Sequence, residues 1–175
     1  MNLIETMLSA ANSGVGQQLA SQFGLKTDQV GSVVATASPL LAGGLKEKLA
    51  SGNAGGLLDI LKSGNLQRYT EDPAAVSSTA AAETGQTILS HLFGEGNALS
   101  NVVSTIAEKT GIGPGTIQSI LPVVTSLFMG SLAKHATGAD GQIDTGNLTN
   151  LVGSLTGEHR GVFDALKTAA GKLFG

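Results

Sequence analysis

The residues whose types and spacing come closest to a chemical site lie in one short segment, Gly138 to Asp144. Its Asp-Gly-Gln-Ile core resembles the centre of a calcium-binding EF-hand loop, which needs oxygen ligands at fixed positions and a bidentate glutamate at the last one. The first and third positions fall on Ala136 and Gly138, which have no side-chain oxygen, and the last falls on Asn147. We therefore predict no metal site here, but a turn in which Asp144 and Thr145 cap the next helix.

The histidines offer no metal pattern either. His91, His135 and His159 are not spaced i, i+4 from another ligating side chain in a way typical of a metal site. A histidine near the end of a helix more often interacts with the last carbonyl groups of that helix. We expect no metal-binding and no cofactor-binding residue, and no cofactor.

Enzymatic activity would need converging polar groups, and few candidates exist. Only Asp140, Asp144, His135 and the Glu158-His159 pair lie near one another along the chain. The sequence has no cysteine, no Gly-x-Ser-x-Gly elbow, no Walker loop and no dinucleotide-binding fingerprint after a strand. We expect no catalytic residue and no enzymatic activity.

The chain has an unusually low proportion of charged residues. Charged residues make up 13% of the chain, against roughly 25% in a typical soluble domain, and the net charge is −3. The ten Lys and Arg residues are scattered, which disfavours a nucleic-acid partner because phosphate contacts need clustered cations. A weakly charged surface is compatible with a plain soluble monomer and equally with self-association or a protein partner.

The chain carries no recognisable targeting segment. Its N-terminus lacks the basic region and apolar core of a secretory signal. The longest apolar stretch, Ile117 to Leu132, is interrupted by polar residues and falls short of the ~18 apolar residues of a membrane span. We interpret it as a buried helix and expect a cytoplasmic protein without a transmembrane segment, although the absence of cysteine does not distinguish cytoplasm from periplasm.

A repeated pattern organises the chain. The stretch from Leu19 to Leu25 (LASQFGL) returns at residues 106–112 (IAEKTGI), and each copy is followed by an apolar run that contains a proline. These pairs identify four structural residues. We predict Gly24 and Gly111 as left-handed helix caps, and Pro39 and Pro122 as kinks or helix starts at corresponding positions.

Apolar spacing predicts helices throughout and no strand. Expected caps are Asn2, Thr27 and the Asp72-Pro73 pair, while Gly113 to Gly115 is expected to be a turn. The fold class is all-α, a multihelical bundle of two related helical halves without a β-sheet. We place the first half at 1–64, a linker or weak helix at 65–83 and the second half at 84–175, together one compact domain. The expected helices cover 2–11, 15–23, 27–45 around the proline, 57–61, 84–93, 97–109, 116–136, 147–155 and 161–174.

Paired helices around a glycine also occur in DNA-binding helix-turn-helix proteins. The second helix of such a motif presents Arg, Lys, Asn or Gln to the major groove. Asp28, Gln29, Gln118 and Ser119 offer little of this kind, and the helices that carry them are mostly apolar. We expect these helices to be buried instead.

The order of these elements is similar to the YidB-like family of bacterial proteins, a domain of unknown function. The matching pieces are Ala20 to Leu25, the later Val33-Val34 and Pro39-Leu40-Leu41, the Ile88-to-Gly94 element, the Ile106-to-Ile112 copy and Leu121-Pro122. The resemblance covers roughly residues 15–135. It implies an all-helical fold and a bacterial origin, and it carries no established activity and no site residues.

Three functions remain open from the sequence. The first is a non-enzymatic structural or self-associating protein, a homo-oligomer or larger assembly. The second is a helical binding module for an apolar ligand, a peptide or a membrane surface. The third is the DNA-binding helix-turn-helix protein, which the scattered cations disfavour.

Overall fold

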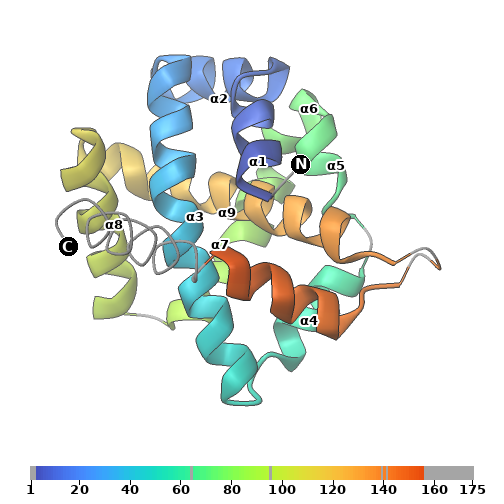
Figure 1. Ribbon diagram of the computed structural model, residues 1–175. Helices are drawn as coiled ribbons and strands as arrows, with labels where there is room; N and C mark the ends of the chain where they lie inside the picture. Colours follow the sequence, from blue (N-terminus) through green and yellow to red (C-terminus); the bar gives the residue numbers. More distant parts are fainter. Residues whose placement is uncertain (1–2, 64, 95, 139, 141, 156–175) are drawn as a thin grey trace, which may run out of the picture.

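The computed structural model describes residues 3–63, 65–94, 96–138, 140 and 142–155, and it is all-α, as the sequence predicts (Figure 1). Within these residues no strand forms, and only an isolated bridge pairs Thr137 with Ile143. Residues 145–155 form a further helix after α9. The labelled helices are α1 (Leu3–Ala11), α2 (Gly14–Phe23), α3 (Thr27–Ala50), α4 (Gly55–Lys62), α5 (Arg68–Glu71), α6 (Pro73–Val76), α7 (Thr79–Phe93), α8 (Asn97–Thr110) and α9 (Pro114–Ala136).

Helix α9 is the centre of the molecule. Residues 120–133 are all buried, and each of the helices α1 to α8 contacts α9. In Figure 1, α9 crosses the middle of the fold behind α1 and α3. A helix that is apolar on every side is stable only when other elements cover all of its faces. The prediction of a buried helix over Ile117 to Leu132 is therefore confirmed.

By length and composition α9 also meets the requirements of a membrane-spanning helix. It has 23 residues, and 83% of its most apolar window is buried inside the structure. A core helix of a water-soluble fold meets the same requirements, because both are surrounded by apolar groups.

Helices α7 and α9 pack closely against each other. Gly85 of α7 lies against the carbonyl group of Pro122, so close that a side-chain carbon at position 85 would overlap that carbonyl oxygen. One turn away, the buried Ser126 hydroxyl donates a hydrogen bond to the Ala81 carbonyl. We call these four residues, Ala81, Gly85, Pro122 and Ser126, the α7–α9 seam. Small residues let two helix backbones approach here, and the carbonyl of Ala81 keeps a hydrogen-bond partner inside the core.

Both predicted glycine caps adopt the left-handed conformation. Gly24 (φ 65°) ends α2 and Gly111 (φ 70°) ends α8, with each amide donating to the carbonyl four residues before it. After Gly24, the Leu25 amide also donates to Ala20, which completes the pattern typical of a glycine-terminated helix. A long helix follows each glycine, and α8 packs on α3 as well as on α9.

The two prolines do not divide their helices. Pro39 lies inside α3 and Pro122 inside α9, and each helix runs on without interruption. The option that a new helix starts at either proline is wrong, while a kink at each proline stays a prediction. A proline removes one helical hydrogen bond and disturbs the turn before it, and burial of the apolar residues on both sides keeps each helix whole.

The segment 65–83, expected as a linker or weak helix, contains α5, α6 and the start of α7. Asp72 caps α6 by accepting a hydrogen bond from the Ala74 amide, and Pro73 takes the first helical position, as predicted. Tyr69 is 2% exposed, and the Arg68 guanidinium lies over its ring at 5.3 Å. Together with Leu66, Val76 and Ala81, Tyr69 ties this segment into the single apolar core.

Three expected boundaries are corrected. Thr27 is the first residue of α3 rather than its cap; the N-cap is Lys26, whose amide donates to the Gln29 side chain. The expected turn at Gly113 to Gly115 is instead the start of α9, with Pro114 in the first turn, where its missing amide costs nothing. Helix α7 begins at Thr79, five residues before the prediction, because Ser78 caps it. Asn2 and the expected helix 161–174 lie outside the described residues.

Replacement of Gly85 by alanine tests the α7–α9 seam. The added carbon must push α7 away from the Pro122 carbonyl, so we expect Gly85→Ala to lower the free energy of unfolding by at least about 3 kcal/mol in urea denaturation. The matched control is Gly43→Ala in α3, where an added side-chain carbon meets nothing within 4 Å. The control should gain about 0.5–1 kcal/mol from helix propensity. A Gly85→Ala variant as stable as the wild type would contradict this packing.

Candidate interaction surfaces

A cleft of about 320 Å³ opens at the C-terminal end of α9, and we call it the α9-end cleft. Four separate stretches of chain build it: the end of α4, the turn before α5, the last turn of α9 and the bridge residues after it. Leu61 and Ala133 form a buried apolar floor, with 1% and 3% of their surfaces exposed. The remaining lining residues are Lys62, Gln67, Thr137, Gln142 and Ile143.

Hydrogen bonds hold part of this lining in place. The Gln67 side-chain amide donates to the Thr137 hydroxyl at 3.2 Å. That hydroxyl donates in turn to the Ala133 carbonyl at 2.6 Å, within the last turn of α9. Gln67 therefore has a defined position, with its carbonyl oxygen and second amide hydrogen not used in this chain of bonds.

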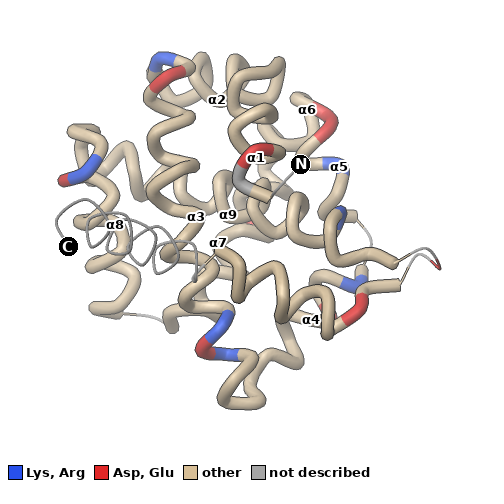
Figure 2. Tube along the Cα trace, viewed as in Figure 1, with Lys and Arg blue, Asp and Glu red and all other residues tan. Residues whose placement is uncertain are grey.

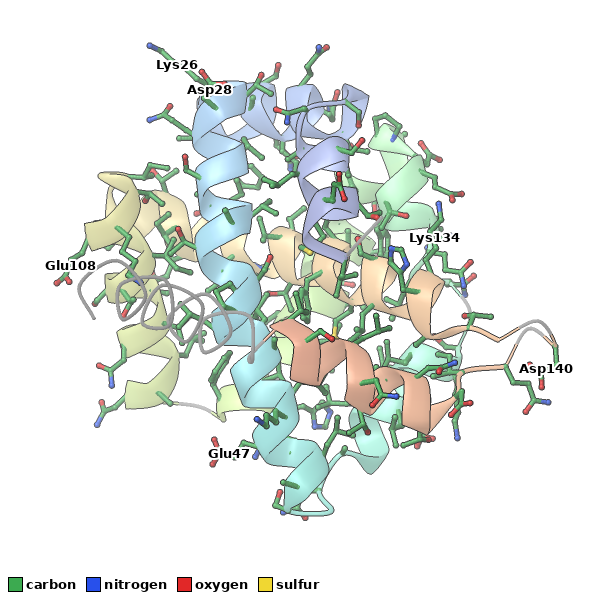
Figure 3. The ribbon with its side chains drawn as sticks, in the orientation of Figure 1. Lys26, Asp28, Glu47, Glu108, Lys134 and Asp140 are labelled. Carbon is green, nitrogen blue, oxygen red and sulfur yellow. The ribbon has the colours of Figure 1, made fainter. Side chains whose placement is uncertain are left out.

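Charges near the α9-end cleft are few and mostly paired. Lys134, labelled in Figure 3, lies 2.6 Å from Glu71 in an ion pair exposed to solvent. Lys62, in the last turn of α4, forms no ion pair with any described carboxylate. An exposed ion pair contributes little stability. The main effect of the pairing is to neutralise the charge of Lys134, so that little net charge remains near the cleft.

A short paired loop forms the outer wall of the α9-end cleft. The Gly138 amide donates to the Gln142 carbonyl, and the Asp144 amide donates to the Ala136 carbonyl, which frames the Thr137–Ile143 bridge. In this type of antiparallel pair, the main-chain groups of the central residues point outward. The amide and carbonyl of Ile143 form no hydrogen bond with the described residues.

A second surface lies between α7, α8 and α9, and we call it the three-helix groove. It has a volume of about 360 Å³ and an apolar floor of Leu89, Leu99, Val103 and Leu121. Neutral side chains form its rim: Gln86, Gln118 and Ser119. No charged residue precedes Glu108 on α8 or Lys134 on α9. Figure 2 shows the charged residues as a few short stretches, mostly near helix ends.

A third hollow, of about 490 Å³, lies at the turn between α8 and α9 beside Gly111, Ile112 and Pro114. In a helix-turn-helix protein, the turn at this place leads into the helix that contacts DNA. The exposed positions at the start of α9, Gly115, Gln118 and Ser119, carry no cation. The hollow therefore lacks the positive charge that phosphate contacts require.

The acidic residues of the predicted turn do not converge. Asp144 accepts hydrogen bonds from the Gly146 and Asn147 amides, so it caps the helix 145–155 as predicted. Asp140 is exposed at the tip of the loop (Figure 3), and its carboxylate lies close to Gly138. Among the described residues, no three His, Cys, Asp or Glu side chains lie close enough to hold a metal ion. Glu158 and His159 lie outside the described residues.

His135 is occupied by a structural contact. Its Nε2 lies 2.9 Å from the Thr6 hydroxyl, which joins the end of α9 to α1. Burial lowers the pKa of His135 below its usual value of 6.5, and the adjacent Lys134 charge lowers it further. His91 is exposed on α7, and its ring approaches Gly56 at the start of α4. These two histidines thus lie on different parts of the molecule.

The sequence of this chain matches one protein-family model. The family model described as "bacterial protein of unknown function (DUF937)" matches residues 5–135. The chain belongs to this family. The YidB-like resemblance is consistent with it. The match takes in most of α1, all of α2 to α8 and nearly all of α9, while the Thr137–Ile143 bridge and the helix 145–155 lie beyond it. No curated protein and no solved structure matches the chain.

Sequence reasoning missed the residues of the α9-end cleft. Lys62, Gln67 and Gln142 are ordinary polar residues, far apart along the chain, and only the fold brings them together. One local signal was available, since Asp140-Gly141 between Thr137 and Ile143 is typical of a tight hairpin turn.

The lowered pKa of His135 predicts a loss of stability in acid. The unfolded chain takes up a proton below about pH 6.5, whereas the folded protein resists it until a lower pH. The free energy of unfolding should therefore fall as the pH drops from about 7.5 to about 5.5. Urea titrations at several pH values measure this fall, which should be smaller in His135→Gln. His91→Gln is the control for loss of a histidine, and an equal fall in all three proteins would refute the assignment.

Proposed function

We propose that this member of the bacterial family is a non-enzymatic structural protein that associates with copies of itself through the three-helix groove. The observation that carries the proposal is the groove itself, an apolar floor with a rim of uncharged amides and hydroxyls. The centres of protein interfaces are depleted in charged residues. A second copy with the same uncharged surface would lose no ionic hydration on docking there.

The neutral surface extends beyond the groove. The exposed residues of α8 before Glu108 are amide, hydroxyl or alanine side chains, namely Asn97, Ala98, Ser100, Asn101 and Ser104. With 13% charged residues in the whole chain, repulsion between copies is weak. The uncharged surface and the weak repulsion between copies both support association.

An internal duplication is a further part of the proposal. The α2–Gly24–α3 and α8–Gly111–α9 units each join a shorter helix to a long one through a left-handed glycine, and each long helix contains a proline. The matching sequence around the two glycines supports a common origin for the two units. In such a chain, two related units already pack against each other within one molecule. Self-association would form the same kind of contact between two molecules.

A second candidate function is a binding module for an apolar ligand or peptide. The observation that favours it is the α9-end cleft, which joins an apolar floor to a small number of fixed polar groups. Such a combination is typical of ligand sites.

Light scattering after size-exclusion chromatography, across a concentration series, tests self-association. We expect the average mass to rise with concentration. In the double variant Gln118→Lys and Ser119→Lys, two added charges at the rim of the groove must lose water on docking, so the association constant should fall at least about tenfold. Both positions are exposed and lysine is a good helix former, so folding should be retained.

Ala50→Lys is the matched control. It adds a positive charge at the exposed end of α3, beside Lys46 and Lys48 and away from the groove. Its association constant should equal that of the wild type. A wild-type protein that stays monomeric at every concentration would overturn the proposal, as would equal association in the double variant.

A further inference from the structure

We propose that the α9-end cleft binds an uncharged, extended peptide segment, with one aliphatic side chain of the peptide resting on Leu61 and Ala133. This inference rests on the second proposed function, the binding module, and assigns its site and the class of its ligand. It is independent of self-association, because the three-helix groove shares no lining residue with the cleft.

The floor and the size of the cleft define the part of the ligand that is buried. Leu61, Ala133 and the half-buried Ile143 offer only aliphatic surface. A volume of about 320 Å³ is near the lower limit of ligand pockets, which span roughly 300–1,000 Å³. One aliphatic side chain with its adjoining main chain fits this space, whereas a nucleotide or a large cofactor exceeds it.

The rim of the cleft matches a peptide main chain. Gln67 and Gln142 each carry an amide, which both donates and accepts hydrogen bonds, as a peptide group does. The bond from Gln67 to Thr137 fixes the first of these amides before any ligand arrives. A group held in position beforehand loses less conformational entropy on binding.

A free main-chain edge adjoins the cleft. The amide and carbonyl of Ile143 form no hydrogen bond with the described residues, while the bonds on either side of the bridge hold that segment extended. An extended peptide pairs with such groups by adding a strand to an exposed edge. Alternate side chains of an added strand point to one face, which would direct one of them toward the apolar floor.

The balance of charge selects an uncharged ligand. Helices α4 and α9 both end at the cleft, and helix C-termini carry partial negative charge. Lys62 and Lys134 lie in these last turns and offset that charge, and Glu71 pairs with Lys134. Asp140, at the tip of the loop in Figure 3, does not line the cleft. A cationic ligand therefore finds no carboxylate among the lining residues, and an anionic ligand finds only the exposed Lys62 amine, where an ion pair contributes little.

Titration of the full chain, labelled with nitrogen-15, with the peptide acetyl-Ala-Leu-Ala-amide tests the inference by NMR. We expect saturable shifts of the Gln67 and Gln142 side-chain amides and of the Ile143 main-chain amide, at up to about 10 mM peptide because ligands of this size bind weakly. The same peptide with Asp or Lys in place of Leu should bind at least about tenfold more weakly, since its charge must be desolvated over Leu61 and Ala133.

Two variants and a control locate the binding. Ala133→Leu fills the cleft and should abolish the shifts. Gln67→Ala keeps the cleft open but removes a hydrogen-bonding group, so the Kd should rise about fivefold. Ala35→Leu makes the same change at an exposed position of α3 and should leave the Kd unchanged. If Ala133→Leu fails to fold, as judged by the dispersion of its amide signals, Gln67→Ala decides the outcome.

The alternatives give distinct results. Equal binding of the Leu, Asp and Lys peptides, or an unchanged Kd in Gln67→Ala, overturns the inference. Cyclohexanol, an uncharged apolar probe without a peptide group, separates the inference from the binding module. If cyclohexanol shifts the amides around the cleft and the Leu peptide does not, the peptide inference is wrong and the binding module stands. If neither probe shifts them, both are wrong.

Discussion

The constraint on which the rest of the structure depends is that the middle of α9 has no exposed side. Residues 120–133 are buried without exception, so the apolar surface of α9 cannot face water on any side, and eight helices share the task of covering it. This requirement explains why Pro122 does not divide the helix. It also explains why very short helices such as α5 and α6 exist, because each contributes a buried side chain, Tyr69 or Val76, to the surface around α9.

Covering a helix so completely needs neighbours that approach it closely, and the composition of the chain provides them. Aromatic residues make up only 3% of the chain, and the first two buried positions of α7 are the small residues Ala81 and Gly85. Where Gly85 meets the Pro122 carbonyl, no larger residue fits. The hydroxyl of Ser126 serves the same arrangement by bonding to the Ala81 carbonyl, since a polar group buried among apolar ones is costly unless it is paired. Ser131, also on α9, is the exception among the described residues, because its buried hydroxyl has no partner.

The sequence predicted what depends on local pattern and failed where distant contacts decide. Gly24, Gly111, Asp72 and Asp144 were identified correctly, since caps follow from a residue and its nearest neighbours. The option of a helix start at Pro122 was wrong because packing around α9 outweighs the local effect of a proline. The segment 65–83 was expected to be a linker or weak helix because its short helices have little periodicity, and its burial depends on α9. The cleft residues Lys62, Gln67 and Gln142 could not be predicted either, because only contacts between distant parts of the chain bring them together.

The two interaction surfaces occupy different parts of the chain in a way that bears on function. Every lining residue of the three-helix groove falls between Gln86 and Leu121, inside the region that matches the bacterial family. The α9-end cleft takes its floor from that region, but its outer wall, Gln142 and Ile143, lies beyond the match. The proposed self-association therefore uses groove residues that all lie inside the family match. The proposed peptide binding would depend on the segment that follows α9, which lies outside the family match.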